Sequence, residues 1–178
     1  FIAATGIALG APLLESHGNG QVISSTQTID GTWGPGTITA TTDVLINPSV
    51  AITIAANTTI RVADGKVLTV LGDLHSDGPV TFTTASLPAV PGAWKGITYT
   101  TGSRGYLSQA VVEYAEHALI LNTTNSITIS NSTIRSNKHT PTSGVDAFGA
   151  GISIVGGTHL VTNTRVHENI LVGGGAGA

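Results

Sequence analysis

The sequence predicts an all-β fold built as a solenoid of stacked, parallel coils. Two observations predict it. Short runs rich in Val, Ile and Thr follow one another from residue 22 to residue 164, and none has a sustained apolar spacing at the helical period. In addition, residues 126–137 (SITISNSTIRSN) return as residues 158–169 (THLVTNTRVHEN) after a shift of 32. Repetition at a fixed distance is typical of solenoids, in which each coil stacks on the one before.

The repeat aligns two pairs of asparagines, Asn131 with Asn163 and Asn137 with Asn169. Residues one coil apart stack about 4.8 Å from each other, the spacing between neighbouring strands. We therefore expect each pair to form a ladder of side-chain amides at a turn.

The same alignment places Val166 over Ile134. Both side chains are apolar and β-branched, so we expect them to be buried over one another inside the core. The alternative is that two loops rich in Asn, Ser and Thr resemble each other by chance.

The individual strands are predicted where apolar and β-branched residues lie between Gly, Asn, Asp and Pro. In chain order they are 37–42, 43–46, 51–56, 58–63, 66–72, 80–84, 96–101, 109–115, 118–122, 126–133, 151–155 and 159–164. Hairpins would need tight two-residue links, and only Asp64-Gly65 and Asp77-Gly78 provide them. Parallel coils are thus favoured, with a hairpin at either link as the alternative.

The chain divides into an apolar N-terminal segment and linker, residues 1–21, and a single β-domain, residues 22–178. The first 14 residues (FIAATGIALGAPLL) are too short to span a bilayer as a helix, so no transmembrane segment is expected. They are either the remainder of a signal segment or a mature N-terminus that packs against another surface. Residues 15–21 (ESHGNGQ) have the composition of a linker.

Residues 31–178 resemble the right-handed parallel β-helix repeat proteins, the pectin-lyase-like group of bacterial and archaeal cell surfaces. The matching residues are Trp33, Asp43-Val44, Ala51–Ile54, Thr59-Ile60, Leu68–Leu74, Gly78, Val80–Thr83, PGAWKGITYTTGS at 91–103, SITISNSTIRSN at 126–137 and GAGISIVGG at 149–157. The resemblance implies a right-handed parallel β-helix that is secreted or displayed on a cell surface, and it carries over no catalytic residues. The chain has Ala56-Asn57 where the family has Gly before a strand, so we expect Asn57 in a left-handed turn conformation.

Composition narrows the choice of partners. The net charge is −3 and the chain has only seven Lys and Arg, so nucleic acid is not an expected partner. Cysteine is absent, which excludes disulfides and thiolate metal sites. Three sequons, at Asn57, Asn122 and Asn131, are candidate glycosylation sites and agree with an exported protein.

Two groups of residues are candidates for chemistry. Asp64, Asp73 and Asp77 are expected at turns of successive coils, where they would be solvated or, less favourably, bind Ca²⁺. Enzymes with this fold group acidic and basic residues on one face of neighbouring coils, which makes VEYAEH (112–117) the other candidate.

In that segment Glu113, Glu116 and His117 are expected within one coil's distance of Arg135 and Lys138. A catalytic cleft is one interpretation, and an exposed strand face with ion pairs is the favoured one. The six histidines lack the His-x-His or His-Glu-x-x-His spacing of metal sites, so neither a metal nor another cofactor is expected. Aromatic residues make up 4% of the chain, too few for a sugar-binding platform.

The sequence therefore predicts a non-catalytic, extracellular structural protein that assembles with copies of itself, head to tail, into a filament, sheath or surface layer. The chain stops at GGAG (174–177), whereas the similar FGAG (148–151) runs into a strand, so a further coil is expected from another subunit or from a longer parent chain. The expected contact residues are Phe1, Ile2, Ile7, Leu9, Leu171 and Val172. The alternative function is a cell-surface β-helix that binds or cleaves polysaccharide.

Overall fold

In a computed structural model of the chain, residues 15–23, 25–141 and 148–173 are described, with side chains from residue 18 onward. These residues form strands, turns and bridges and no helix, so the all-β prediction is confirmed. No helix in this part of the chain is long and apolar enough to cross a membrane. Every pairing between strands is parallel.

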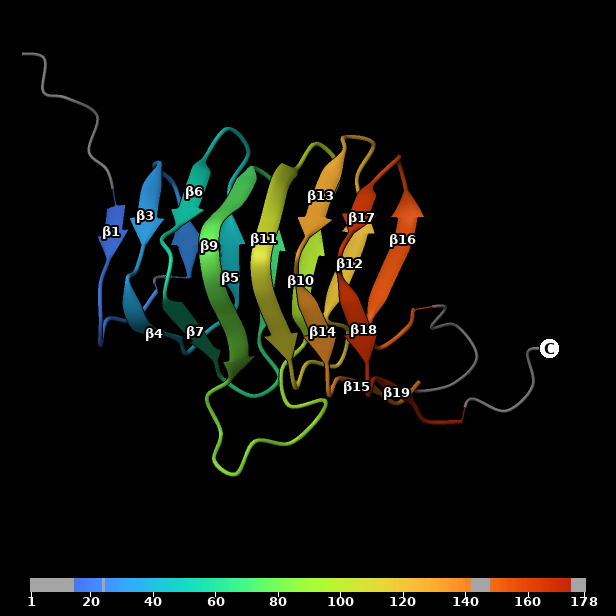
Figure 1. The fold of residues 1–178 in the computed structure, drawn as a ribbon. Helices are drawn as coiled ribbons and strands as arrows, with labels where there is room; N and C mark the ends of the chain where they lie inside the picture. Colours follow the sequence, from blue (N-terminus) through green and yellow to red (C-terminus); the bar gives the residue numbers. More distant parts are fainter. Residues whose placement is uncertain (1–14, 24, 142–147, 174–178) are drawn as a thin grey trace, which may run out of the picture.

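The strands are grouped in three sheets (Figure 1). The largest sheet has two connected parts. One part runs in the order β1 (Glu15–His17), β3 (Gly31–Trp33), β6 (Ala51–Ile54), β9 (Asp73–Thr84), β11 (Arg104–Glu113), β13 (Ile127–Ser130), β17 (Leu160–Thr162). In the other part, β4 (Gly36–Ala40) pairs with β7 (Thr58–Val62), β7 with β9, β11 with β14 (Thr133–Arg135), and β14 with β18 (Arg165–His167).

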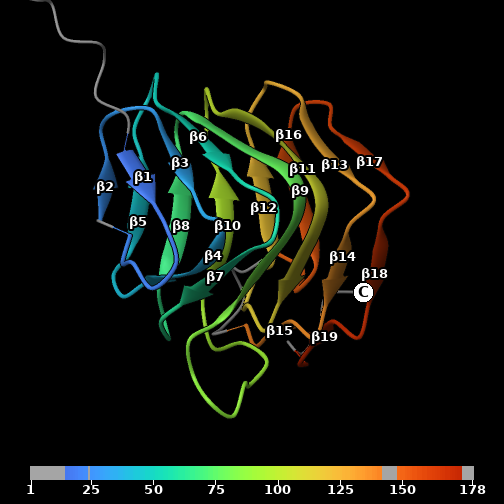
Figure 2. The same ribbon diagram turned by 60° about the vertical axis from the view of Figure 1, so that its left-hand side comes forward.

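The second sheet lies behind the first when the molecule is turned (Figure 2). Its order is β2 (Thr26–Gln27), β5 (Val44–Ile46), β8 (Val67–Val70), β10 (Gly96–Tyr99), β12 (Leu119–Asn122), β16 (Ile152–Gly156). A third, small sheet pairs β15 (Lys138–His139) with β19 (Ile170–Leu171).

Each strand pairs with a strand that follows it by one circuit of the chain. Gly31 pairs with Ile52, and Ile52 with Leu74, so these circuits take 21 and 22 residues. The circuit from Leu74 to Gly105 takes 31, because it includes the loop that projects below the sheets between β9 and β10 (Figure 1). Strands stacked circuit upon circuit, all parallel, are compatible with a parallel β-helix.

The core lies between the sheets and is formed by alternate residues of each strand. In β9 the even-numbered residues from Leu74 to Thr84 are buried, while the residues between them are half-buried or exposed. This alternation arises because successive side chains of a strand point to opposite faces. The largest fully buried side chains are Trp33, Trp94, Tyr99 and Phe82. Burial raises the pKa of the Tyr99 hydroxyl.

Three sequence-based expectations about local structure are corrected. The hairpin alternative is wrong for the described residues. β7 and β8, on either side of Asp64-Gly65, have only parallel partners, and Asp77-Gly78 lies within the single strand β9. Asp73 and Asp77 lie inside β9 and not at turns, because one continuous strand covers Asp73–Thr84. Residues 15–17 are not part of a linker, because they form β1 and pair with β3.

The turn prediction for Asn57 is confirmed, since its φ is 61°. Ser49, Gln109 and Tyr114 also have positive φ values, at 65°, 55° and 61°. Asn57 is the residue among them whose short amide side chain tolerates this conformation best.

The predicted register of the repeat is confirmed, since Ile134 pairs with Val166. Ile134 is fully buried, as expected, but the burial predicted for Val166 is wrong: its side chain is 48% exposed. The reason is that β18, which carries Val166, is the last strand of its stack in the described chain. An inward-facing side chain is buried only when a further coil covers it.

Candidate functional site

The polar segment predicted around residue 113 lies where β11 ends and the chain turns toward β12. Glu113 is the last residue of β11, and Glu116 and His117 lie in the turn. The next coil brings Arg135 and Lys138 to the same edge of the molecule, through β14 and β15. The expected grouping of these residues is therefore present, and it separates into two centres.

The first centre is an ion pair between Glu113 and Arg135. The Arg135 guanidinium donates from Nε and Nη2 to Glu113 Oε2, at 3.0 and 2.9 Å, and the Thr83 hydroxyl donates to Oε1 at 3.1 Å. Glu113 is only 9% exposed. Both carboxylate oxygens of Glu113 thus have partners. This arrangement fits a structural contact that joins three coils better than it fits a catalytic acid or base.

The second centre gathers around Glu116, whose two oxygens face different partners. Lys95 donates a hydrogen bond to Oε2, and His139 Nδ1 lies 3.4 Å from Oε1. Burial alone raises the pKa of Glu116, but the hydrogen bond and charge of Lys95, with the charges of His117 and His139, outweigh it. The pKa of Glu116 therefore lies below its ordinary value of 4.5.

His117 and His139 lie against each other beside Glu116. Their ring centroids are 4.0 Å apart with the planes inclined at 42°, and the Phe148 ring approaches His117 edge-on at 5.6 Å. His139 is fully buried and His117 is 9% exposed. His117 Nδ1 lies 3.2 Å from the Gly149 carbonyl oxygen. One ligand atom each of Glu116, His117 and His139 lie within 4.8 Å of one another.

The closeness of these two histidines is not predicted by any metal-binding spacing within one segment of the sequence. The signal that could have predicted their contact is the number of residues in one coil. Val112 pairs with Ile134 at a distance of 22 residues, and the same distance separates His117 from His139. Side chains at that offset stack in neighbouring coils.

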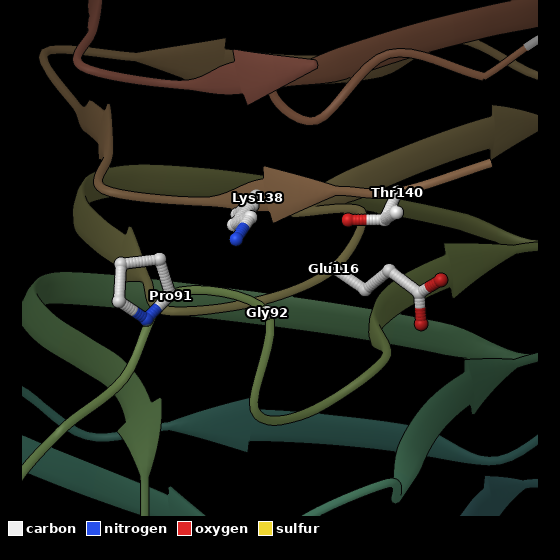
Figure 3. A pocket seen from close by; sticks show the side chains of 5 residues that line it. All are labelled: Pro91, Gly92, Glu116, Lys138 and Thr140. Carbon is white, nitrogen blue, oxygen red and sulfur yellow. The ribbon is translucent and has the colours of Figure 1, made fainter. Parts of the chain in front are cut away.

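A hollow of about 240 Å³ adjoins the second centre (Figure 3). Its lining residues are Pro91, Gly92, Glu116, Lys138 and Thr140. Figure 3 shows the Glu116 side chain reaching away from Pro91 and toward the side of Thr140. Glu116 thus connects the solvent-facing hollow with the buried pair of histidines.

The lowered pKa of Glu116 predicts a specific acid sensitivity. A carboxylate with a depressed folded-state pKa contributes stability above its unfolded-state pKa and loses it as the pH falls through the folded-state value. Between about pH 5 and pH 3, the free energy of unfolding should therefore fall less steeply in Glu116→Gln than in the unchanged chain. Urea denaturation across that range measures the slopes. Lys95→Gln should flatten the same part of the curve, and equal slopes in all three proteins would contradict the prediction.

The other predicted group, Asp64, Asp73 and Asp77, is not brought together. Asp73 and Asp77 are four residues apart in one strand, which separates them by about 13 Å. The Asp64 carboxylate instead accepts hydrogen bonds from the hydroxyls of Thr84 and Ser86, at 3.1 and 2.7 Å. The expected stacking of these aspartates in successive turns is therefore wrong.

The asparagine pairs lie where the repeat places them. Asn163 Nδ2 donates to Asn131 Oδ1 at 3.4 Å, on the surface. Asn137 Nδ2 donates to Asn169 Oδ1 at 2.8 Å, and Asn137 is fully buried. The buried amide also accepts from the backbone N–H of Ala115 at 2.8 Å, so it links three coils. The three sequon asparagines, Asn57, Asn122 and Asn131, are all exposed.

The last described coil has an apolar face with no cover. Eight of the twelve exposed large hydrophobic side chains in the described chain lie between residues 154 and 172. Three of them continue inward-facing stacks: Ile154 follows Leu121, Val161 follows Ile129, and Val166 follows Ile134. The first residue of each pair is fully buried, whereas Ile154, Val161 and Val166 are 57%, 39% and 48% exposed. We call residues 152–172 the open end, because no described coil covers their apolar side chains.

Of the predicted contact residues, Leu171 and Val172 belong to the open end and are 58% and 39% exposed. Phe1, Ile2, Ile7 and Leu9 lie outside the described residues. At the opposite end of the stack, Ile23 and Gln27 are buried in the first coil.

Comparison with known proteins adds no family: no family model, no curated protein and no solved structure matches the chain.

Proposed function

We propose that the chain is a non-catalytic, extracellular structural protein, a right-handed parallel β-helix that assembles head to tail with copies of itself. The observation that carries the proposal is the open end. Its side chains occupy core positions of the strand pattern, and its strands have unpaired edges in the described chain. An apolar surface of this kind marks a contact with another β-structure.

The occupant that we propose is the N-terminal end of a second copy. β1 is the outermost strand at one end of the large sheet, and β17 and β18 are the outermost strands at the other end (Figure 1). All the pairings are parallel, so a copy stacked in the same orientation continues the strand direction across the joint. Residues 1–14, which precede β1, are uncharged and apolar, which complements the exposed core at the open end. Such a head-to-tail contact does not close on itself and produces a filament.

The candidate chemistry of the polar segment also favours a structural role. Glu113 is held by Arg135 and Thr83, and both Trp33 and Trp94 are fully buried and cannot stack on a sugar. Polysaccharide cleavage needs carboxylates that face a bound substrate. Glycans on Asn57, Asn122 and Asn131, all exposed, belong to the same proposal of an exported protein.

Assembly should depend on both ends of the chain. Deletion of residues 1–14 should leave a folded protein that no longer forms filaments in negative-stain microscopy and sedimentation. Val166→Asp, which places a charge on the open end, should have the same effect.

The matched control is Leu87→Asp, because Leu87 is 79% exposed but lies in the loop between β9 and β10, away from the open end. This variant should assemble like the unchanged chain. A chain that stays monomeric at every concentration would overturn the proposal and favour an open end covered by a further coil of a longer parent chain. Filaments that persist after deletion of residues 1–14 would reject the proposed joint and leave direct stacking of coils.

A further inference from the structure

We propose that Glu116, His117 and His139 bind one divalent transition-metal ion, zinc being the best fit, as a clamp between the β11–β12 turn and β15. One ligand atom from each residue already lies within 4.8 Å of the others. Two imidazoles and one carboxylate are a common zinc-binding set, with the fourth position of the tetrahedron left to water. The proposal does not rest on the proposed assembly of copies at the open end.

The orientation of His117 suits a metal ligand. Its Nδ1 lies 3.2 Å from the Gly149 carbonyl oxygen, an atom that can only accept a hydrogen bond. Nδ1 must therefore carry the proton, which leaves the lone pair on Nε2. A histidine that ligates a metal through one nitrogen while donating from the other to a carbonyl is the usual arrangement in metal sites.

The two carboxylate oxygens of Glu116 have different partners. Oε2 accepts from Lys95, and Oε1 faces His139 Nδ1 at 3.4 Å. In a tetrahedral zinc site with bonds of about 2.0–2.1 Å, neighbouring ligand atoms are about 3.4 Å apart. Oε1 and Nδ1 therefore already have the spacing of two ligands on one ion, while Lys95 holds the other oxygen away.

The two histidines are mostly buried, while Glu116 connects the site to solvent. His139 is fully buried and His117 is 9% exposed, so the ion would lie in a partly dehydrated environment. Glu116 lines the hollow shared with Lys138 and Thr140, which provides an entry for the ion and room for water (Figure 3). Imidazole ligands favour zinc and its neighbours over Ca²⁺, which prefers six or more oxygens.

The site is tested by titrating the full chain with ZnCl₂ in a calorimeter and with CoCl₂ in a spectrophotometer. We expect saturable binding of one ion, with the intense visible absorption of tetrahedral Co²⁺, and no binding of CaCl₂. His117→Ala should abolish the cobalt absorption. Glu116→Gln should weaken zinc binding by at least about tenfold, the smallest loss expected for a ligand when a supporting residue alone is worth that much. Zinc should also raise the melting temperature of the unchanged chain but not that of His117→Ala.

Two matched variants separate the site from general effects of charge and imidazole. Glu113→Gln changes a carboxylate of the same segment that is engaged by Arg135. His167→Ala removes a histidine that lies 3.4 Å from a carboxylate, that of Glu168. Both should bind zinc like the unchanged chain, and circular dichroism verifies that each variant is folded. The proposal is overturned if the unchanged chain takes up no zinc, or if His117→Ala and Glu116→Gln bind it with unchanged affinity.

Discussion

Ile134→Asp should unfold the protein or cost more than about 4 kcal/mol of its free energy of unfolding. Ile134 is fully buried in the stack of coils, paired with Val112 on one side and Val166 on the other. An aspartate there would bury a carboxylate in the hydrophobic core. Urea denaturation followed by circular dichroism measures the loss, and Ile134→Val, which removes a single methylene, should cost about 1 kcal/mol.

Val166→Asp is the matched control, because it makes the same chemical change one coil further along. Val166 is 48% exposed, so its aspartate remains in water and the cost should stay within about 1 kcal/mol. Both variants are measured as monomers, below the concentration at which copies assemble, and similar losses there would show that the register is wrong. The pair thus measures what a covering coil contributes at one position of the core.

Gly96→Ala should destabilise the protein by about 4 kcal/mol or more. Gly96 begins β10 with a φ of +102°, and a Cβ added there would lie 1.5 Å from the carbonyl oxygen of His117. Backbone atoms cannot move aside as a flexible side chain can, so β10 and the turn that carries His117 would have to separate. The pairing of Ile97 with Leu119 would be disturbed at the same time.

Gly102→Ala is the matched control, because it measures the cost of the backbone conformation without a steric clash of the added Cβ. Gly102 also has a positive φ, +91°, but a Cβ added there meets no atom within 4 Å. We expect a loss of about 1–2 kcal/mol, the cost of placing an L-residue in a left-handed conformation. Thermal denaturation of the two variants measures the difference, and equal losses would contradict the close approach of Gly96 to His117.

The proposed zinc site and the open end are neighbours in the stack. His139 pairs with Leu171, and the N–H of Val172 donates to the His139 carbonyl at 2.9 Å. A metal held by His139 would therefore fix the strand on which the last described coil rests. The two proposals can still fail separately, because zinc binding is measured by titration and assembly by microscopy.

The all-β class, most of the strands and the register of one repeat could be predicted from the sequence. The strand positions could be predicted because β-branched residues alternate with polar ones and are bounded by Gly, Asn and Asp. The register of Asn131 on Asn163 and Asn137 on Asn169 was readable for another reason. An amide that bonds to the coil above needs a partner amide at the same place, so stacked asparagines are repeated in the sequence.

Outside that repeat, the residues that stack on one another in neighbouring coils are known only from the tertiary structure. Core positions accept any aliphatic side chain of suitable size, so coils that stack need not resemble each other, and the 22-residue offset that joins His117 to His139 leaves no repeated motif. Loops of different length, such as the one between β9 and β10, change the offset from coil to coil. Burial is likewise a property of the stack: Ile134 and Val166 are similar residues at equivalent positions, and only Ile134 has a described coil on both sides.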